Sequence, residues 1–236
     1  KTTLTANDPV SQALILFRAL ALPREGLRVP RPFFVGDLMM YTPAHFHETD
    51  AAAIEALIEA YPLAALVAQT PEGLVANHVP LLREGDALVG HIALANDLHR
   101  LLDDGAEVLA IFRGEDSYIS PNWYPTKAET HRAVPTWNYQ VVHVHGRIGF
   151  QHDRKAKLAV VGRLTKRHED AVNGAGGWRM ADAPKDYLET MLDNIVTFRI
   201  EIARVLAKSK LNQNRADTDF NAVTEQMAEQ GCLAAG

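Results

Sequence analysis

Three short apolar runs follow one another closely in the first half of the chain, and they restrict the fold more than any other feature of the sequence. They cover residues 63–70, 74–83 and 87–95, and the turn sequences Pro71-Glu72-Gly73 and Glu84-Gly85-Asp86 separate them. Each run has the length and composition of a β-strand. Because connections this short join antiparallel neighbours, the sequence predicts a three-stranded meander.

The remaining apolar patterns predict more strands, with helices before, between and after them. We predict strands at 108–112, 117–120, 137–150 and 196–206, and helices at 51–60, 97–102, 153–167, 182–192 and 217–230. Strands at short spacing with helices grouped at the ends favour a mostly β fold of the α+β class. The expected architecture is an antiparallel sheet closed into a barrel, with the helices outside it.

Composition excludes several classes of protein. With 236 residues, of which 47% are hydrophobic and 22% charged, the chain can bury a large core and is neither disordered nor fibrous. A net charge of -5 argues against a surface that binds polyanions throughout. The single cysteine, Cys232, cannot form an internal disulfide, which favours a reducing compartment and predicts a cytoplasmic protein. No apolar run approaches the roughly 18 residues of a membrane span, so we expect no membrane partner.

The first 39 residues differ from the rest of the chain. A helical pattern begins at Asp8-Pro9 and ends at Pro23, and the proline-rich stretch Pro30-Arg31-Pro32 follows. We therefore expect residues 1–39 to form an appended arm with a helix and a linker. Residues 40–236 are expected to form one domain that ends in a helix.

An aromatic and polar segment, residues 116–149, is the strongest candidate for a ligand site. It holds two of the three tryptophans and three of the six tyrosines, among hydroxyl groups, an amide and a lysine. Such a mixture suits a planar ligand that carries a phosphate. If the region forms a regular strand, Trp137, Tyr139, Val141, His143, His145 and Arg147 share one face, and Asn138, Gln140, Val142, Val144 and Ile148 share the other.

Four features allow both a functional and a structural interpretation. His143 and His145 have a spacing that can bind a metal, but no third ligand is evident, and a hydrogen-bonded pair is the alternative. Lys127 can meet a phosphate or can be a solvated loop residue. His78 can face a ligand or mark a strand edge before Pro80. The basic helix at residues 154–167 can be a solvated face or a contact to nucleic acid.

Motifs spread along residues 40–236 resemble the FMN-binding negative transcriptional regulator family of the PaiB type. The motifs are Met40-Tyr-Thr-Pro-Ala-His-Phe, Asn77-His-Val-Pro-Leu, Gly90-His-Ile-Ala-Leu-Ala-Asn96, Tyr118-Ile-Ser-Pro-Asn-Trp-Tyr124, Val134-Pro-Thr-Trp-Asn-Tyr139, Val142-His-Val-His-Gly146 and Ser209-Lys-Leu-Asn-Gln-Asn-Arg215. The resemblance implies a split β-barrel of the flavin-reductase-like kind. It also implies a homodimer with two flavin sites between the subunits, and a role in gene regulation.

Carried onto this chain, the resemblance implies the flavin contacts His78, His91, Ser120, Trp123, Tyr124, Lys127, Trp137 and Asn138. Lys127 and Ser120 suit the phosphate, Trp123 or Trp137 suits a face of the flavin ring, and Asn138 suits its pyrimidine edge. Asn212, Gln213 and Arg215 are expected to complete the pocket from the C-terminal segment, from the same subunit or its partner.

The function expected from these residues is a cytoplasmic, dimeric FMN-binding protein that senses redox or metabolite state or performs weak flavin chemistry. Whether it is an enzyme stays open, because the flavin brings its own chemistry and no catalytic residue is identified. One alternative is a haem protein with an axial ligand from His78, His91, His143 or His145. A second alternative is a DNA-binding repressor for which the ligand is only an effector.

Overall fold

The structure is a computed structural model, and it describes residues 40–229. The predicted N-terminal arm at residues 1–39 and Cys232 lie outside the described residues. The strands are β1 (His47–Glu48), β2 (Leu63–Thr70), β3 (Gly73–Pro80), β4 (Leu82–Glu84), β5 (Ala87–Ala93), β6 (Ala106–Ile119), β7 (Thr136–Gln151) and β8 (Ile195–Lys210). The α-helices are α2 (Ala51–Ala60), α3 (Leu98–Leu101), α4 (Lys127–Thr130), α5 (Arg154–Asn173), α6 (Lys185–Asp193) and α7 (Asp217–Glu229). None of these described helices is both long and apolar enough to cross a membrane.

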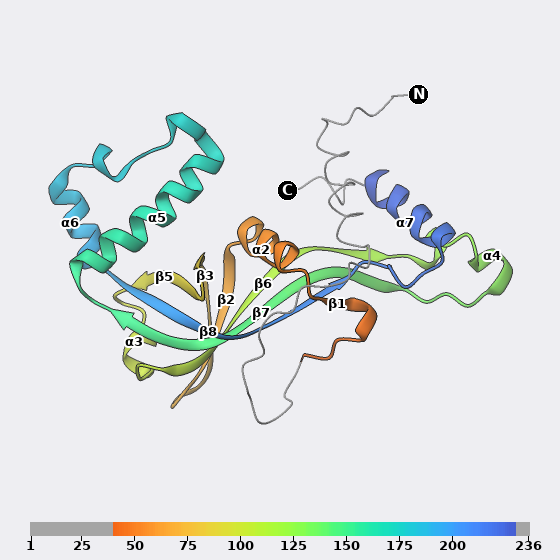
Figure 1. Cartoon of the computed structure of the whole chain (residues 1–236), viewed down its shortest axis with the longest axis horizontal. Helices are drawn as coiled ribbons and strands as arrows, with labels where there is room; N and C mark the ends of the chain where they lie inside the picture. Colours follow the sequence, from red (N-terminus) through yellow and green to blue (C-terminus); the bar gives the residue numbers. More distant parts are fainter. Residues whose placement is uncertain (1–39, 230–236) are drawn as a thin grey trace. The chain divides into compact units, whose positions relative to one another are not determined.

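All eight strands belong to one antiparallel sheet (Figure 1). The strand order is β3-β2-β6-β7-β8-β5-β4, and β1 pairs with β8 beside this path. The antiparallel, mostly β architecture with peripheral helices is therefore confirmed. The path has free ends at β3 and β4, so the sheet is not closed, and the expectation of full closure into a barrel is wrong.

The predicted meander is also wrong, because its strands form two separate hairpins. Strand β2 pairs with β3 from Leu63↔Pro80 to Thr70↔Gly73, as the first turn sequence predicts. The predicted second strand then breaks, since Pro80 has no N–H to continue a ladder and the N–H of Leu81 donates to Pro62 O at 2.9 Å. Strand β5 pairs with β4 and β8 instead of β3.

The predicted strands at 108–112 and 117–120 are one continuous strand, β6. The polar residues between them suggested a break, but the strand continues through them, and Arg113 and Asp116 form an ion pair within this stretch. Strand β8 is also longer than predicted and continues past Leu206 to Lys210. In both cases polar residues occupy a strand where the apolar pattern had ended.

The chain divides into two compact units, which we describe separately. Unit 1 comprises residues 1–60, 113–142 and 206–236, and unit 2 comprises residues 61–112 and 143–205. In unit 1, Val223 and Met227 of α7 pack with Ile119 and Tyr124 in a small core. In unit 2, Val160 and Leu164 of α5 pack on Val89 of β5.

Strand β7 follows the predicted alternation along its 16 residues. The even-numbered positions Asn138, Val142, Val144, Gly146 and Ile148 are buried, whereas the odd-numbered positions 137–147 are exposed or half-buried. The buried face of β7 therefore includes one polar side chain among these five residues, the amide of Asn138.

Gly146→Ala should destabilise unit 2, because an added Cβ would lie 2.5 Å from both Glu201 O and Ile200 Cγ2. We expect the free energy of unfolding to fall by about 1–3 kcal/mol in urea titrations. Gly149→Ala on the same strand is the matched control, since its nearest neighbour, Asp104 Oδ1, would be 3.9 Å from the added carbon. Equal stability of the two variants would contradict this account of the packing.

Candidate functional site

The loop from Ser120 to Lys127 in unit 1 is shaped by its own polar side chains. Ser120 Oγ accepts a hydrogen bond from Asn122 N at 3.2 Å, which caps the short 3-10 helix Pro121–Trp123. Lys127 begins α4, and its Nζ donates to Asn122 Oδ1. The two residues predicted to meet a phosphate therefore share Asn122 as a neighbour, and both of their polar groups have partners within the loop.

Helix α7 fixes the same loop from its first turns. Asp219 Oδ2 accepts a hydrogen bond from Thr126 Oγ1 at 2.7 Å, and Asp219 Oδ1 accepts one from Thr126 N at 3.1 Å. Asp219 is only 6% exposed, so water does not compete strongly for these bonds. These two bonds fix the position of Thr126, the residue before Lys127, at the start of α4.

Tyr124 lies inside the unit 1 core, with Trp123 packed against the same cluster. Its ring contacts the α7 side, and the guanidinium carbon of Arg215 lies 4.7 Å from the ring centroid. The hydroxyl of Tyr124 is buried and has no hydrogen-bond partner among the described residues. A polar group of this kind is available to a ligand or to water.

Trp137 and Asn138 lie on opposite faces of β7. Trp137 is 53% exposed, and its ring makes an edge contact with Tyr118 at a centroid distance of 5.8 Å. Asn138 is 2% exposed, and neither Oδ1 nor Nδ2 has a partner within residues 40–229. A buried amide without partners costs free energy, so its presence favours a ligand that supplies both a donor and an acceptor.

Six of the eight residues predicted to contact flavin thus belong to unit 1. His78 and His91 belong to unit 2, where His78 is exposed on β3. His91 on β5 is half-buried, its Nδ1 has no partner in the described part of the chain, and burial lowers its pKa. The imidazole of His91 therefore favours the neutral form.

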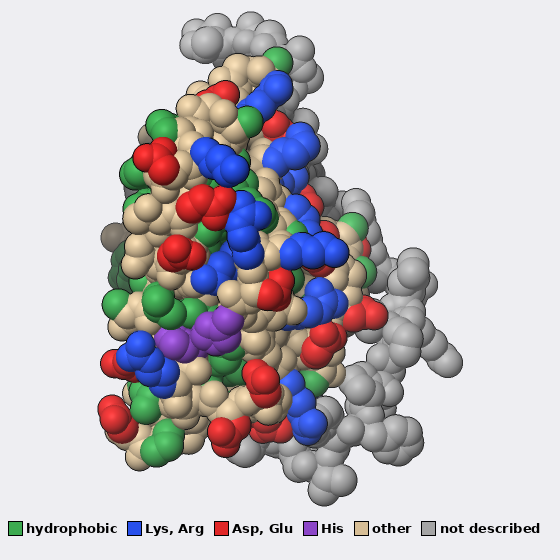
Figure 2. All heavy atoms as spheres, turned by 90° about the vertical axis from the view of Figure 1, so that its left-hand side faces the viewer, with side chains coloured by type: hydrophobic (Ala, Val, Ile, Leu, Met, Phe, Trp, Pro, Cys, Tyr) green, Lys and Arg blue, Asp and Glu red, His purple; other side chains and the backbone are tan. Residues whose placement is uncertain are grey.

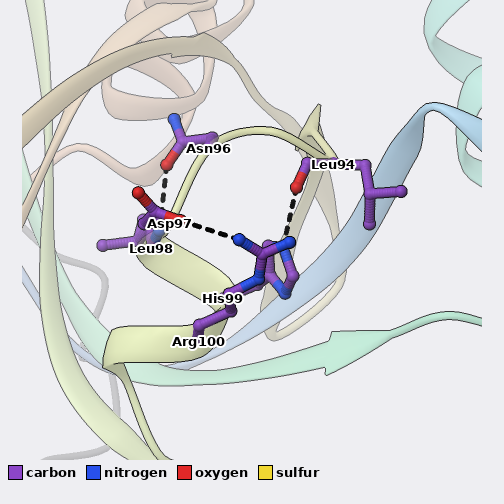
Figure 3. Close-up of polar contacts among 6 residues, drawn as sticks. All are labelled: Leu94, Asn96, Asp97, Leu98, His99 and Arg100. Carbon is purple, nitrogen blue, oxygen red and sulfur yellow. Dashed lines mark hydrogen bonds and ion pairs between the residues drawn. The ribbon is translucent and has the colours of Figure 1, made fainter.

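The segment that follows His91 in unit 2 is held by its own hydrogen bonds (Figure 3). Leu98 N donates to Asn96 Oδ1 at 3.0 Å, and His99 Nε2 lies 3.0 Å from Leu94 O. Outside this close-up, Asn96 Nδ2 donates to Asn77 Oδ1 at 2.7 Å. Asn77, next to His78, is thereby tied to the turn after β5.

His143 and His145 lie on the half-exposed face of β7, as the alternation predicted. His145 Nε2 lies 3.4 Å from Arg204 Nη2. Burial lowers the pKa of both histidines, and the positive charge of Arg204 and then His143 lowers that of His145 further, while Glu107 raises it. Between residues 40 and 229, no cluster of three or more His, Cys, Asp or Glu side chains is arranged to hold a metal ion.

Two lysines that were not predicted to contact flavin lie in unit 1, although one of them, Lys210, belongs to the motif Ser209–Arg215. Lys208 and Lys210 are two positions apart at the end of β8, and this spacing places them on one side of the strand. Lys210 Nζ donates to Trp137 O at 2.6 Å and to Thr136 Oγ1. The spacing was visible in the sequence, but it carried no weight because the predicted strand ended at Leu206.

Comparison with known proteins identifies the family. Residues 40–204 match the family described as "Putative FMN-binding domain". The chain belongs to this FMN-binding family. It is also 31% identical over 196 residues to "Protease synthase and sporulation protein PAI 2" of Bacillus subtilis, a match that covers 81% of this chain and 90% of the relative. The expected PaiB-type membership is thus confirmed, and the family match supports FMN as the cofactor.

Solved structures support the fold of this family member. The flavocytochrome Anf3 of Azotobacter vinelandii matches with a TM-score of 0.53 and 16% identity over 74% of each chain. A protein of Mycobacterium smegmatis described as binding FAD and heme matches with a TM-score of 0.54 and 18% identity, over 75% of this chain and 79% of that one. At these identities the likeness shows the fold alone, which is the split barrel that was predicted.

The residues of unit 1 fit an FMN molecule in chemical type. The unpartnered amide of Asn138 matches a ring edge that has both donors and acceptors, and the exposed ring of Trp137 offers an aromatic wall. Lysines on β8 and in the 120–127 loop supply positive charge for a phosphate.

Asp219→Ala should loosen the loop that carries Lys127, because it removes both hydrogen bonds to Thr126. We expect a loss of about 1–3 kcal/mol in the free energy of unfolding, since the Thr126 N–H is left without its acceptor. Asp217→Ala, in the same first turn but exposed, is the control and should change stability by less than about 0.5 kcal/mol. A loss as large in the control would show that only the helix terminus matters.

Acidification should destabilise the protein through its histidines. The pKa values of His91, His143 and His145 are lowered by folding, so below the ordinary value of 6.5 the unfolded chain binds protons that the folded chain disfavours. The free energy of unfolding should therefore decrease as the pH falls through 6.5. In urea titrations between pH 8 and pH 5.5, His143→Gln/His145→Gln should weaken this dependence, and an unchanged slope would contradict the assignment.

Proposed function

We propose that the chain binds FMN through unit 1 and that the bound flavin serves a regulatory protein of the PaiB type. The observation that carries this proposal is the side chain of Asn138, which is buried on β7 with both polar atoms unpartnered within the described structure. A folded protein tolerates such an amide when a ligand supplies its missing hydrogen-bond partners. The pyrimidine edge of a flavin provides the required donors and acceptors.

The other predicted contacts take roles that follow from their positions. Trp137 is exposed and provides a wall for one face of the ring, and the hydroxyl of Tyr124 is a further unpartnered donor. Ser120 and Lys127 stay predictions for the phosphate, because each must give up or share its bond with Asn122. The flavin supplies redox chemistry, while these side chains bind and orient it. His78 and His91, in unit 2, stay predictions without an assigned contact.

A regulatory role is supported by the Bacillus subtilis relative, whose name refers to protease synthesis and sporulation. We propose that this protein is a cytoplasmic regulator that responds to flavin redox state or to a metabolite. We also propose a homodimer, since Tyr41, Val134 and Trp137 expose large apolar side chains in unit 1.

DNA is a proposed partner of this regulator, but the basic helix α5 is a poor candidate for the contact. Its side chains are paired with acids, as in Arg154–Glu189, Arg163–Glu84 and Lys166–Asp170. Figure 2 shows basic and acidic side chains interspersed on the face of unit 2 that carries α5 and α6. Gel-shift titrations at low salt test the partner directly, and a complex whose affinity does not fall with added salt would argue against DNA backbone contacts.

Haem is the second candidate ligand, favoured by one observation. His91 is held in its neutral form by burial and has an unpartnered Nδ1, and a neutral imidazole is the form that ligates iron. The two solved structures described above as a flavocytochrome and as an FAD and heme binding protein have this fold. A Soret band on addition of hemin, lost in His91→Ala and retained in His99→Ala, would favour haem.

Asn138→Leu tests the flavin site with little risk to the fold. Because the amide has no described partner, removing it should leave stability unchanged or increase it, while FMN affinity falls about 10- to 100-fold. Flavin fluorescence quenching measures the affinity, and thermal melting measures the stability. Gln140→Leu on the same face is the control, since its Nε2 donates to Ser209 Oγ at 3.1 Å and its loss should weaken stability more than flavin affinity. Unaltered FMN binding in Asn138→Leu would refute the assignment.

A further inference from the structure

Unit 1 contains three cations that no described acid neutralises. They are Lys208 and Lys210 at the end of β8, and Arg215 in the turn that follows this strand in the sequence. Among residues 40–229, no carboxylate forms an ion pair with any of them. Lys208 Nζ donates instead to Tyr41 O at 3.2 Å, and Lys210 Nζ donates to neutral oxygens of β7.

Aromatic rings surround the two lysines. Lys208 Nζ lies 5.2 Å from the ring centroid of Tyr139 and 5.7 Å from that of Tyr41. Lys210 Nζ lies 6.0 Å from the ring centroid of Phe46. Contacts of this kind attract a cation, but they leave its full charge in place.

Burial makes this uncompensated charge costly. Lys208 is only 7% exposed. Burial lowers the pKa of Lys210, and the neighbouring charges of Lys208 and Arg215 lower it further, which shows that the three cations repel one another. A cluster of this kind is stabilised by an anion.

The turn between Lys210 and Arg215 is held rigidly. The side chain of Gln213 donates from Nε2 to His45 O at 3.1 Å and to Ser209 O at 2.5 Å, and its Oε1 accepts from Leu211 N at 2.7 Å. Asn212 adopts a left-handed conformation with φ of 62°, and its buried Nδ2 has no partner in the part of the chain that is described. A donor without a partner thus lies in the chain between the cations.

We propose that Lys208, Lys210 and Arg215, with the amide of Asn212, form a phosphate subsite that selects flavin mononucleotide over flavins without a phosphate. A phosphate monoester carries a charge of roughly -1.5 to -2 at neutral pH and has three acceptor oxygens, which matches three cations and an unpaired N–H. This inference rests on the proposed flavin site and assigns its phosphate to the end of β8. The 120–127 loop then supports the site, since Lys127 Nζ already has Asn122 as its partner.

The test compares FMN with riboflavin on the full chain. Lys210→Met retains the length of the side chain and removes its charge, so FMN should bind about 10- to 100-fold more weakly while riboflavin binding stays the same. Lys166→Met, on an exposed lysine of α5, is the charge-matched control and should change neither affinity. Lys127→Met tests the alternative that Lys127 is the residue that binds the phosphate. An unchanged preference for FMN in Lys210→Met, or its loss in Lys127→Met instead, would overturn the assignment.

Inorganic pyrophosphate separates this inference from the flavin proposal. It should raise the melting temperature of the wild type, and Lys210→Met should abolish this rise. If wild type binds neither flavin but retains the Lys210-dependent response, the flavin proposal fails, and with it the selection of FMN, and the cluster is only a site for a phosphate-bearing anion. If FMN binds and neither Lys210→Met nor Lys208→Met alters its advantage over riboflavin, the flavin proposal stands and the subsite is refuted.

Discussion

Strand β7 must bury one face along its length, and the candidate site follows from this constraint. Successive side chains of a strand point to opposite faces, so Asn138 shares the face that buries Val142, Val144 and Ile148. Asn138 is thereby taken out of water although it is polar, and Trp137 beside it is left exposed although it is apolar. The same regularity that builds the core of the sheet thus places an amide without partners among the described residues in the interior and an aromatic ring at the surface.

Side-chain hydrogen bonds fix two other segments of unit 1, the 120–127 loop and the turn after β8. Asp219 fixes the loop at Thr126, and Gln213 fixes the turn after β8 through three separate bonds. All of these bonds except the one to His45 O are partly buried, so they define the backbone closely. The amides of Asn138 and Asn212, by contrast, have polar atoms without a partner among the described residues, and Lys208 and Lys210 donate only to neutral oxygens there. A division between a completed framework and incomplete binding groups is typical of a site formed before its ligand arrives.

The sequence predicted local regularity well and long-range pairing poorly. The apolar run at 63–70 and the residue pattern at 137–150 revealed strands β2 and β7, because strand patterns are local properties of the sequence. It could not reveal that β5 pairs with β8, since that register joins residues more than 100 positions apart, as in Ala87↔Glu201. Lys208 and Lys210 were not assigned a role, although Lys210 lies in the motif Ser209–Arg215, because apolar alternation had ended before them and their aromatic neighbours come from distant segments. The burial of Tyr124 likewise depends on α7, which the 118–124 motif does not contain.

The division into two units has a consequence for how such a protein can arise. The chain passes between the units four times, and three of these passages fall inside β6, β7 and β8, which belong to both units. A gene fragment that encodes either unit would be interrupted, in three pieces for one unit and two for the other. No continuous segment of the chain therefore carries all of either unit without also carrying part of the other.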